Sequence, residues 1–127
     1  ELERSRKRYR ALVDTAPTAI AVIDADDGSI VELNQSAESL LGYDSEALSG
    51  ESHTVLHPPE DEGLYETLFH ERLESGAGMV SKHADGSQVN ICTADGERIP
   101  VEISSQVIEL ENERLVQSVI RDVVKRS

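Results

Sequence analysis

The segment from Gly28 to Gly50 constrains the fold of this chain more than any other part of the sequence. It begins with alternating residues typical of a half-buried strand, with Val31 and Leu33 predicted on one face and Ile30 on the other. Asn34 follows directly and is a good N-cap, and the apolar residues after it repeat at helical spacing until a glycine stops them. A second short capped helix closes the segment. A strand that enters a helix with almost no loop is typical of a small α+β domain.

The flanking patterns predict the remaining elements in order. These are a connecting helix over residues 1–14, strands over 18–24 and 29–33, short helical turns up to residue 59, a helix over 60–74, and strands over 87–93, 98–110 and 115–124. Residues 75–78 are predicted to end the long helix, and 79–85 fit either a loop or a short strand. The order predicts one α+β domain over 15–124, in which a five-stranded antiparallel sheet carries a cap of short helices on one face. Residues 1–14 are expected to be an N-terminal linker helix, and 125–127 the start of a C-terminal linker.

The charge of the chain limits its partners. The sequence holds 25 acidic and 12 basic residues, a net charge of −13. Such a surface repels phosphate backbones and anionic lipids, so neither nucleic-acid binding nor membrane contact within this segment is expected. No apolar run approaches the ~18 residues of a membrane span. Arginines outnumber lysines, and the acidic excess predicts a halophilic protein, with an acidic mesophilic domain as the alternative.

The single cysteine, Cys92, bears on where the protein is found. One thiol cannot form an internal disulfide, and no signal-peptide pattern is present, so a reducing, cytoplasmic location is predicted. The alternation of its strand puts Cys92 on the outer face of the sheet, where we expect a buried, inert thiol beneath the N-terminal helix. The chain has no initiator methionine, so we expect it to be a piece of a longer protein.

The inward faces of the predicted strands and the apolar side of the helices define a candidate ligand pocket. Its members are Ala21, Ile23, Val89, Ile91, Val101, Ile103, Ser118 and Ile120 on the strands, and His53, Leu56, His57 and Leu68 on the helical side. Pockets of this kind are apolar with few polar groups, here the two histidines, Ser118 and Ser105. Because no arginine or lysine is expected inside, the predicted ligand is small, neutral and mostly apolar, such as an aromatic heterocycle. A filled core without a ligand is the alternative.

His53 and His57 are four residues apart, a spacing that on a helix can hold a metal. No third ligand is placed nearby, so a metal site, polar contacts to a ligand and plain surface positions all stay open for this pair, and we predict no metal. No G-x-S-x-G, H-E-x-x-H or phosphate-binding glycine loop is present. The chain is therefore not expected to be an enzyme, and a histidine–metal enzyme is the one alternative of that kind.

The order of elements and several short motifs resemble those of PAS domains, over about residues 8–124. The motifs that carry the resemblance are the apolar strand ending in Asp24 with the run from there through Gly28 to Asn34, A-x-x-L-L-G-Y from Ala37 to Tyr43, E-x-L-x-G from Glu46 to Gly50, D-G-x-x-x-P-V-E-x-S from Asp95 to Ser104, and R-D-V from Arg121 to Val123. The resemblance implies a PAS fold and a sensory or dimerisation module linked to a histidine kinase or a transducer. It also implies a homodimer that forms through the N-terminal helix and the outer face of the sheet.

The resemblance allows the flavin-binding subtype to be compared position by position. In LOV domains a reactive cysteine lies where this chain has His53, and the arginine and glutamine that hold the flavin correspond to Thr54 and His57. The flavin-binding amides of the last three strands correspond to apolar residues, namely Ile91, Val101 and Ile120. These residues could not pair the polar edge of a flavin, so flavin is not expected.

The haem-binding subtype is compared in the same way. Its iron-ligating histidine corresponds to Tyr65, and His70 lies over one turn further along the helix. The apolar stripe of this helix, formed by Leu64, Tyr65, Leu68, Phe69 and Leu73, turns His70 away from the pocket, so haem is not expected either. The predicted function is a sensory PAS module that binds a small ligand and relays the signal to a linked output. A ligand-free PAS module for dimerisation and domain coupling is the alternative.

Overall fold

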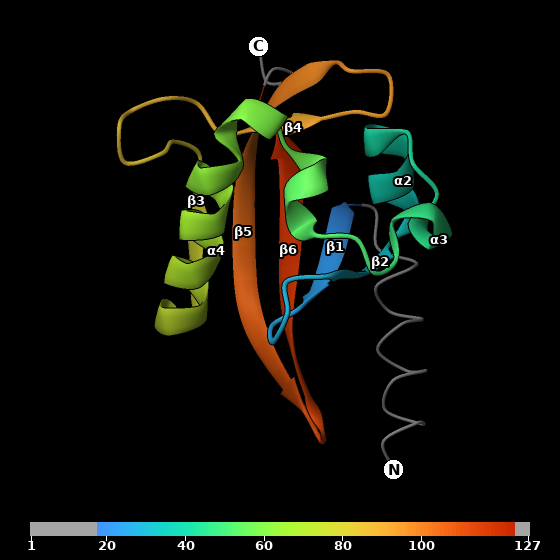
Figure 1. Ribbon diagram of the computed structural model, residues 1–127, viewed down its shortest axis with the longest axis vertical. Helices are drawn as coiled ribbons and strands as arrows, with labels where there is room; N and C mark the ends of the chain where they lie inside the picture. Colours follow the sequence, from blue (N-terminus) through green and yellow to red (C-terminus); the bar gives the residue numbers. More distant parts are fainter. Residues whose placement is uncertain (1–17, 124–127) are drawn as a thin grey trace.

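The computed structural model describes residues 18–123 (Figure 1). The predictions for the N-terminal helix, for the C-terminal linker and for dimer contacts through that helix lie outside the described residues. The strands are β1 (Ala19–Asp24), β2 (Ile30–Leu33), β3 (Ala77–Val80), β4 (Asn90–Cys92), β5 (Arg98–Leu110) and β6 (Glu113–Asp122). The helices are α2 (Gln35–Leu41), α3 (Ser45–Leu48) and α4 (Glu62–Ser75), with the 3-10 turns η1 (His53–Leu56) and η2 (Pro59–Asp61). No helix in the described range is long and apolar enough to cross a membrane.

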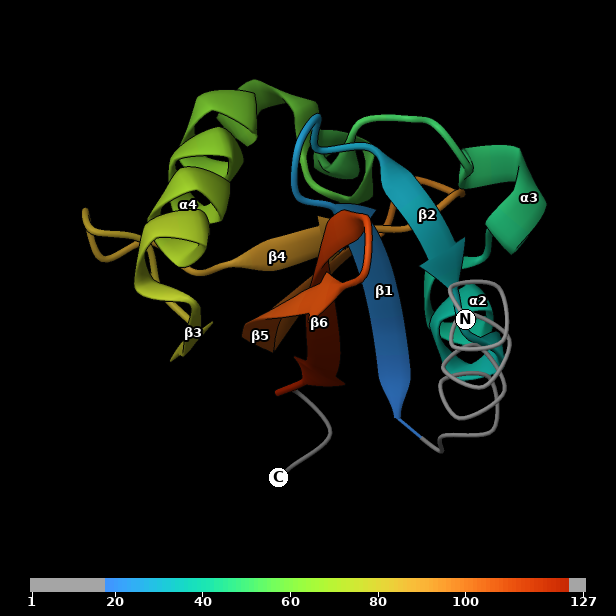
Figure 2. The same ribbon diagram turned by 90° about the horizontal axis from the view of Figure 1, so that it is seen from below.

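The strands form one antiparallel sheet in the order β2-β1-β6-β5-β3, and the short β4 pairs with the first residues of β5. The last strand in sequence therefore lies in the middle of the sheet, between β1 and β5. The helix α4 lies over one face of this sheet (Figure 2). Residues of α2, α3 and η1 belong to the same buried core as those of α4. The predicted α+β fold, an antiparallel sheet with short helices on one face, is confirmed.

β3 is a strand that the sequence pattern left unresolved. α4 ends at Gly76, whose φ of 85° lies in the left-handed region that glycine adopts readily. The chain reverses there, so Ala77–Val80 runs antiparallel to Gln106–Ile103 of β5. The predicted end of the helix at residues 75–78 is confirmed. A strand already begins at Ala77, which was not predicted, because pairing with β5 overrides the weak strand propensity of an alanine–glycine segment.

A β-bulge in β2 changes which residues face the interior. Leu33 pairs with Ala21 and Ile30 pairs with Ile23, which leaves Val31 as an additional residue without a partner in the register. Ile30 and Leu33 are therefore both buried in the main core, whereas Val31 packs against the apolar cluster on the other face. The prediction that Val31 and Leu33 share a face is wrong, because strict alternation does not hold across a bulge.

Asn34 joins the sheet to the first helix. It is fully buried, and its Oδ1 accepts hydrogen bonds from the N–H of Ala37 at 3.0 Å and of Ile20 at 2.9 Å. Its Nδ2 donates to the carbonyl oxygen of Thr18 at 2.8 Å. The predicted N-cap is confirmed, and the same side chain also holds the beginning of β1.

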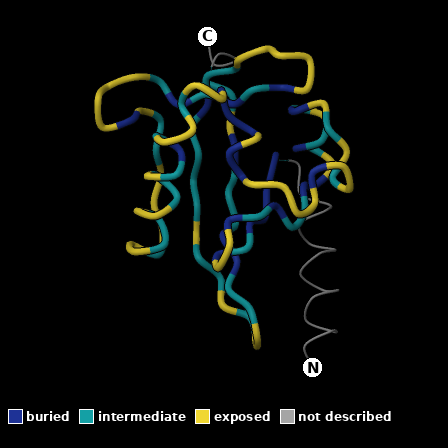
Figure 3. The backbone as a smooth tube through the Cα atoms, in the orientation of Figure 1, coloured by how far each residue is buried: buried dark blue, intermediate teal, exposed yellow. Residues whose placement is uncertain are grey.

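The outer face of the sheet carries a second apolar cluster, separate from the core under the helices. Its buried members are Ile20, Val22 and Leu115, and its half-buried members are Val31, Leu110 and Val119. Figure 3 shows that exposed residues gather at the β5–β6 turn and on α4, and that the buried ones lie mainly in the middle of the fold. The sheet is therefore apolar on both faces near β1, as predicted for that strand.

Candidate functional site

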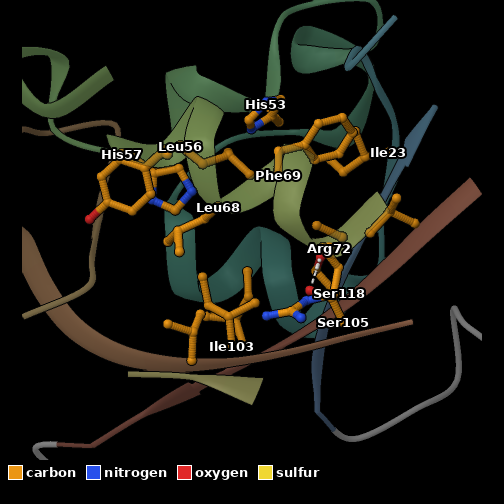
Figure 4. A pocket seen from close by; sticks show the side chains of 15 residues that line it. Ile23, His53, Leu56, His57, Leu68, Phe69, Arg72, Ile103, Ser105 and Ser118 are labelled. Carbon is orange, nitrogen blue, oxygen red and sulfur yellow. Dashed lines mark hydrogen bonds between the residues drawn. The ribbon is translucent and has the colours of Figure 1, made fainter. Parts of the chain in front are cut away.

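A cavity of about 70 Å³ lies between the helical layer and the inner face of the sheet (Figure 4). Residues of α4 and η1 form one wall, and residues of β1, β3, β5 and β6 form the other. The lining residues are Ala21, Ile23, His53, Leu56, His57, Tyr65, Leu68, Phe69, Arg72, Val80, Ile103, Ser105, Val116, Ser118 and Ile120. The lining is mostly apolar, with polar groups from two histidines, two serines, one tyrosine and one arginine.

A row of small residues crosses four strands, and three of its members, Ala21, Ser105 and Ser118, form the floor of the cavity. Gly78 of β3 pairs with Ser105 of β5. Ser105 pairs in turn with Ser118 of β6, and Ser118 pairs with Ala21 of β1. The two neighbouring rows are bulkier, with Val80, Ile103 and Ile120 on one side, where Ala19 continues the row on β1, and Val107, Val116 and Ile23 on the other. Because paired side chains on one face stand next to each other, the small row leaves a trough between two bulky rows.

The two serines of this row are hydrogen-bonded to each other, with their Oγ atoms 3.0 Å apart. Figure 4 draws this bond between Ser105 and Ser118 as a dashed line, with the side chain of Arg72 close by. Two hydroxyl groups carry two hydrogens, and their mutual bond uses one of them. The other hydroxyl hydrogen can therefore be donated to a bound molecule.

Most of the predicted site residues line the cavity. They are Ala21, Ile23, His53, Leu56, His57, Leu68, Ile103, Ser118 and Ile120. Val89, Ile91 and Val101 do not line it, and each is fully buried in the closed part of the core. The register explains the difference, because Val101 pairs with Asp122 and its N–H bonds to Val89, which places them beyond the row of Ile103 and Ile120. Contact with a ligand remains a prediction for every one of these residues.

Some lining residues were not among the predicted site residues. They are Tyr65, Phe69, Arg72, Val80 and Val116, whereas Ser105 was predicted as a polar group of the pocket. Tyr65, Phe69 and Arg72 lie at positions i, i+4 and i+7 of α4, and this spacing puts them on one helical face. The spacing is visible in the sequence, and it is the signal that identifies Arg72 as an inward-facing residue.

Two histidines at η1 stack on two aromatic rings of α4. The ring centroids of His53 and Phe69 are 4.3 Å apart, and those of His57 and Tyr65 are 3.7 Å apart. Gly28 makes room for the first stack, because a Cβ at this position would lie 3.3 Å from His53 Cδ2. The two imidazoles thus face separate rings.

In the described part of the chain, no three His, Cys, Asp or Glu side chains gather as a metal site would need.

Burial keeps the imidazoles of the cavity neutral near pH 7. His57 Nδ1 lies 2.8 Å from the carbonyl oxygen of Asn90, which only accepts, so Nδ1 carries the hydrogen. Burial lowers the pKa of His57 to about 4, although the bond to Asn90 opposes this effect. Burial also lowers the pKa of His53, against the raising effect of Glu66, whose Oε1 is 3.6 Å from His53 Nε2. The fixed positive charge of the lining therefore belongs to Arg72.

Arg72 contradicts the prediction that no arginine or lysine lies inside the pocket. The side chain is half-buried in the last turn of α4, and its Nη1 donates to Ser75 Oγ at 3.1 Å and to the carbonyl oxygen of Ala77 at 3.3 Å. These bonds hold the guanidinium beside β3. The prediction of a strictly neutral ligand loses its main argument, because the cavity does contain a cation.

Three further residues lie outside the cavity lining. His83 is buried, and its ring contacts the ring of Tyr65 edge-on, with 4.8 Å between the ring centroids. Neither of its ring nitrogens has a hydrogen-bond partner among the described residues. His70 is exposed on α4, as the apolar stripe predicts. Cys92 is half-buried rather than buried, because it lies in the short β4, which pairs with one strand alone. It does not line the cavity.

The fold and the cavity together define a class of protein, a small α+β module with an internal cavity between a helical layer and an antiparallel sheet. The chain belongs to the PAS domain family, whose model matches residues 17–125. It is therefore a PAS sensory domain, and it is homologous to PAS domains of histidine kinases.

Individual relatives agree with this assignment. The cell-division control histidine kinase PdhS of Brucella ovis is 28% identical over 124 residues, which cover 98% of this chain and 12% of the kinase. The PAS domain of an HTR-like protein from Haloarcula marismortui is 28% identical with a TM-score of 0.69, and the match covers 96% of this chain and 94% of that domain. A LOV protein from Rhodobacter sphaeroides superimposes with a TM-score of 0.81 at 12% identity, and the match covers 98% of this chain and 70% of the LOV protein. At this identity the similarity shows the fold alone. The chain thus spans about an eighth of the length of the curated kinase that it matches.

Proposed function

We propose that this chain is the sensory module of a larger signalling protein, and that it binds a compact ligand in the cavity and relays the signal to a linked histidine kinase or transducer output. The observation that carries the proposal is the cavity itself, because Ser118 and Ile120 of the central strand β6 form part of its wall. A ligand that packs differently against α4 and β6 in two states shifts the population of those states. Ile120 is two residues from the end of β6 at Asp122, so such a shift has a short path to the C-terminal end of the domain.

The size of the cavity supports a compact ligand. Pockets for drug-sized molecules have volumes of about 300–1,000 Å³, whereas this cavity measures about 70 Å³. An isoalloxazine or a haem does not fit this space unless it displaces core residues such as Ile91 and Val101, both of which are fully buried. We therefore propose a small organic molecule as the ligand, and the absence of flavin and haem remains a prediction.

The small volume also favours a second candidate function. In this alternative the domain binds no ligand and serves dimerisation and domain coupling. The half-buried members of the apolar cluster on the outer face, Val31, Leu110 and Val119, would then form part of the dimer contact, together with the predicted N-terminal helix. This alternative predicts a protein that is purified without any bound molecule and that gains stability when the cavity is filled.

Native mass spectrometry of the purified chain separates the two functions. With a bound ligand, we expect a mass above that of the bare chain, and we expect the Ala21→Val variant to lose the adduct because the added methyl groups occupy the trough. Ala19→Val is the matched control, since Ala19 lies on the same face of β1 but does not line the cavity. A bare mass for the natural chain, with a higher melting temperature for Ala21→Val, would establish the ligand-free alternative.

The acidic composition leads to a prediction about salt. Raising KCl from about 0.2 M to about 3 M shortens the Debye length from roughly 7 Å to below roughly 3 Å and screens the repulsion among the 25 acidic residues. We expect the melting temperature to rise by roughly 10 °C over this range. Sucrose is the control, because it strengthens burial without screening charge. A melting temperature that does not change with KCl would contradict a halophilic origin, which remains a prediction, as does the cytoplasmic location.

A further inference from the structure

Arg72 differs from the other arginines that the structure describes. Each of the others pairs with a glutamate: Arg98 with Glu60, Arg114 with Glu109 and Arg121 with Glu102. Among residues 18–123, no carboxylate oxygen lies within 4.0 Å of the Arg72 guanidinium, although the chain holds 25 acidic residues. The arginine without a carboxylate is therefore the one that lines the cavity.

The hydrogen bonds of Arg72 leave part of its guanidinium available. Only Nη1 is hydrogen-bonded within the described range, to Ser75 and Ala77. A guanidinium has five N–H groups in a fixed planar fork, so the groups on Nη2 and Nε remain for another acceptor. An anion with two oxygens in one plane matches such a fork, and a carboxylate is an anion of this kind.

Gly78 is what allows the guanidinium to lie beside β3. A Cβ at this position would be 2.3 Å from Arg72 Nη1 and 2.8 Å from Cζ, which is closer than any real contact. Gly78 is not among the glycines with positive φ, so the backbone there does not itself require glycine. The lack of a side chain at position 78 therefore leaves the space that the Arg72 guanidinium occupies. Its neighbour across the strand pair is Ser105, one of the two serines that share a hydroxyl hydrogen bond.

We infer that the cavity binds a compact monocarboxylate, whose carboxylate group is held by Arg72 and by the free hydroxyl hydrogen of the Ser105–Ser118 pair. The apolar part of the ligand lies toward Leu68 and Ile103 on the rest of the lining. At about 70 Å³ the cavity has room for roughly five or six water-sized groups, which is the size of propionate or butyrate. Dicarboxylates are disfavoured, because the second negative charge would find no second arginine or lysine among the described lining residues. This inference rests on the proposed function and names its ligand class.

The test compares butyrate with butyramide, a neutral molecule of nearly the same shape. The ¹⁵N-labelled 127-residue chain is titrated with each and followed by its amide resonances, a method that detects millimolar binding. We expect saturable shifts of residues around the cavity with butyrate, and binding at least about tenfold weaker with butyramide, since a hydrogen bond to a charged group is lost. Equal affinity for the two molecules would overturn the carboxylate inference while leaving the proposed ligand cavity intact.

Variants then assign the binding to Arg72. We expect Arg72→Gln to weaken butyrate binding at least about tenfold and to remove the preference over butyramide. Arg121→Gln is the matched control, because it removes the same charge from an exposed residue that does not line the cavity. An unchanged butyrate affinity in Arg72→Gln would overturn the inference.

A second pair of variants tests the same point without changing any charge. Gly78→Ala displaces the guanidinium, so we expect it to weaken butyrate binding by a similar factor. Gly63→Ala on α4 is the control, since a Cβ there meets nothing within 4 Å. If neither butyrate nor butyramide binds to the natural chain, the carboxylate inference falls. The proposed function is then decided separately by the native mass of the purified protein.

Discussion

Replacing Asn34 with alanine is expected to lower the free energy of unfolding by about 3–5 kcal/mol. The side chain is fully buried and bonds the N–H groups of Ile20 and Ala37 and the carbonyl oxygen of Thr18. Alanine leaves all three groups without this partner, and a buried polar group without a partner costs about 1–3 kcal/mol. The loss would therefore exceed the ~1 kcal/mol typical of an N-cap alone. Urea denaturation followed by circular dichroism measures it.

Asp44→Ala is the matched control for this prediction. Asp44 is also an N-cap residue, of α3, but its side chain makes no capping hydrogen bond and is exposed. We expect its replacement to change the free energy of unfolding by less than about 0.5 kcal/mol. If Asn34→Ala cost no more than Asp44→Ala, the tie between β1 and α2 would not contribute to stability.

Acidification from pH 6.5 to pH 4 is expected to destabilise the domain by about 3 kcal/mol through His57 alone. Burial lowers the pKa of this imidazole in the folded state to about 4, whereas in the unfolded chain it has its ordinary value near 6.5. Between these values the unfolded state binds more protons, so stability falls as the pH falls. His53, whose pKa burial also lowers, adds to the loss in the same direction.

Three hydrogen-bonded aspartates act in a lower pH range. Hydrogen bonds from Ser29, Ser87 and Thr93 lower the pKa of Asp27, Asp85 and Asp95, respectively, below the ordinary 3.8. The stability that these aspartates contribute is fully present above pH 3.8 and is lost only as the pH falls through their lowered pKa values. This loss therefore occurs at a lower pH than the loss caused by the histidines.

His57→Gln tests the assignment to this histidine. We expect the dependence of the unfolding free energy on pH between 6.5 and 4 to become clearly shallower than in the natural chain. His70→Gln is the control, because it removes an exposed imidazole of α4, whose ring meets Phe69 edge-on with 6.4 Å between the centroids. The comparison uses the slope and not the absolute stability, since the variant also loses the stack on Tyr65. Equal slopes in His57→Gln and the natural chain would show that other groups cause the acid sensitivity.

Much of the fold was predictable because local patterns and tertiary structure agree. β5 has the bounds predicted from its alternation, Arg98–Leu110, and Asn34 caps the helix that the sequence indicated. The predictions failed where an interaction distant in sequence decides the outcome. The bulge at Val31 depends on the register with β1, and β3 exists because residues after Gly76 pair with β5. Neither register can be read from a single segment.

The candidate site shows the same division. Alternation identified the inward faces, and most of the predicted residues do line the cavity. It could not show which inward residues are covered, so Val101 was included although the core closes over it. Arg72 is absent from the predicted site residues, although its spacing from Tyr65 places it on the inward face of α4. Helical position is therefore a better guide than the expectation that no charged residue lies inside.

The row of small residues across the sheet has a consequence for how such a domain changes over time. Strand pairing uses backbone groups, whereas the trough is set by the small size of the residues at positions 78, 105, 118 and 21. Exchanging one small side chain for another alters the shape and polarity of the trough and leaves the strand register unchanged. The shape of the cavity and the architecture can thus diverge independently, and a protein engineer can reshape the cavity by varying one row of residues.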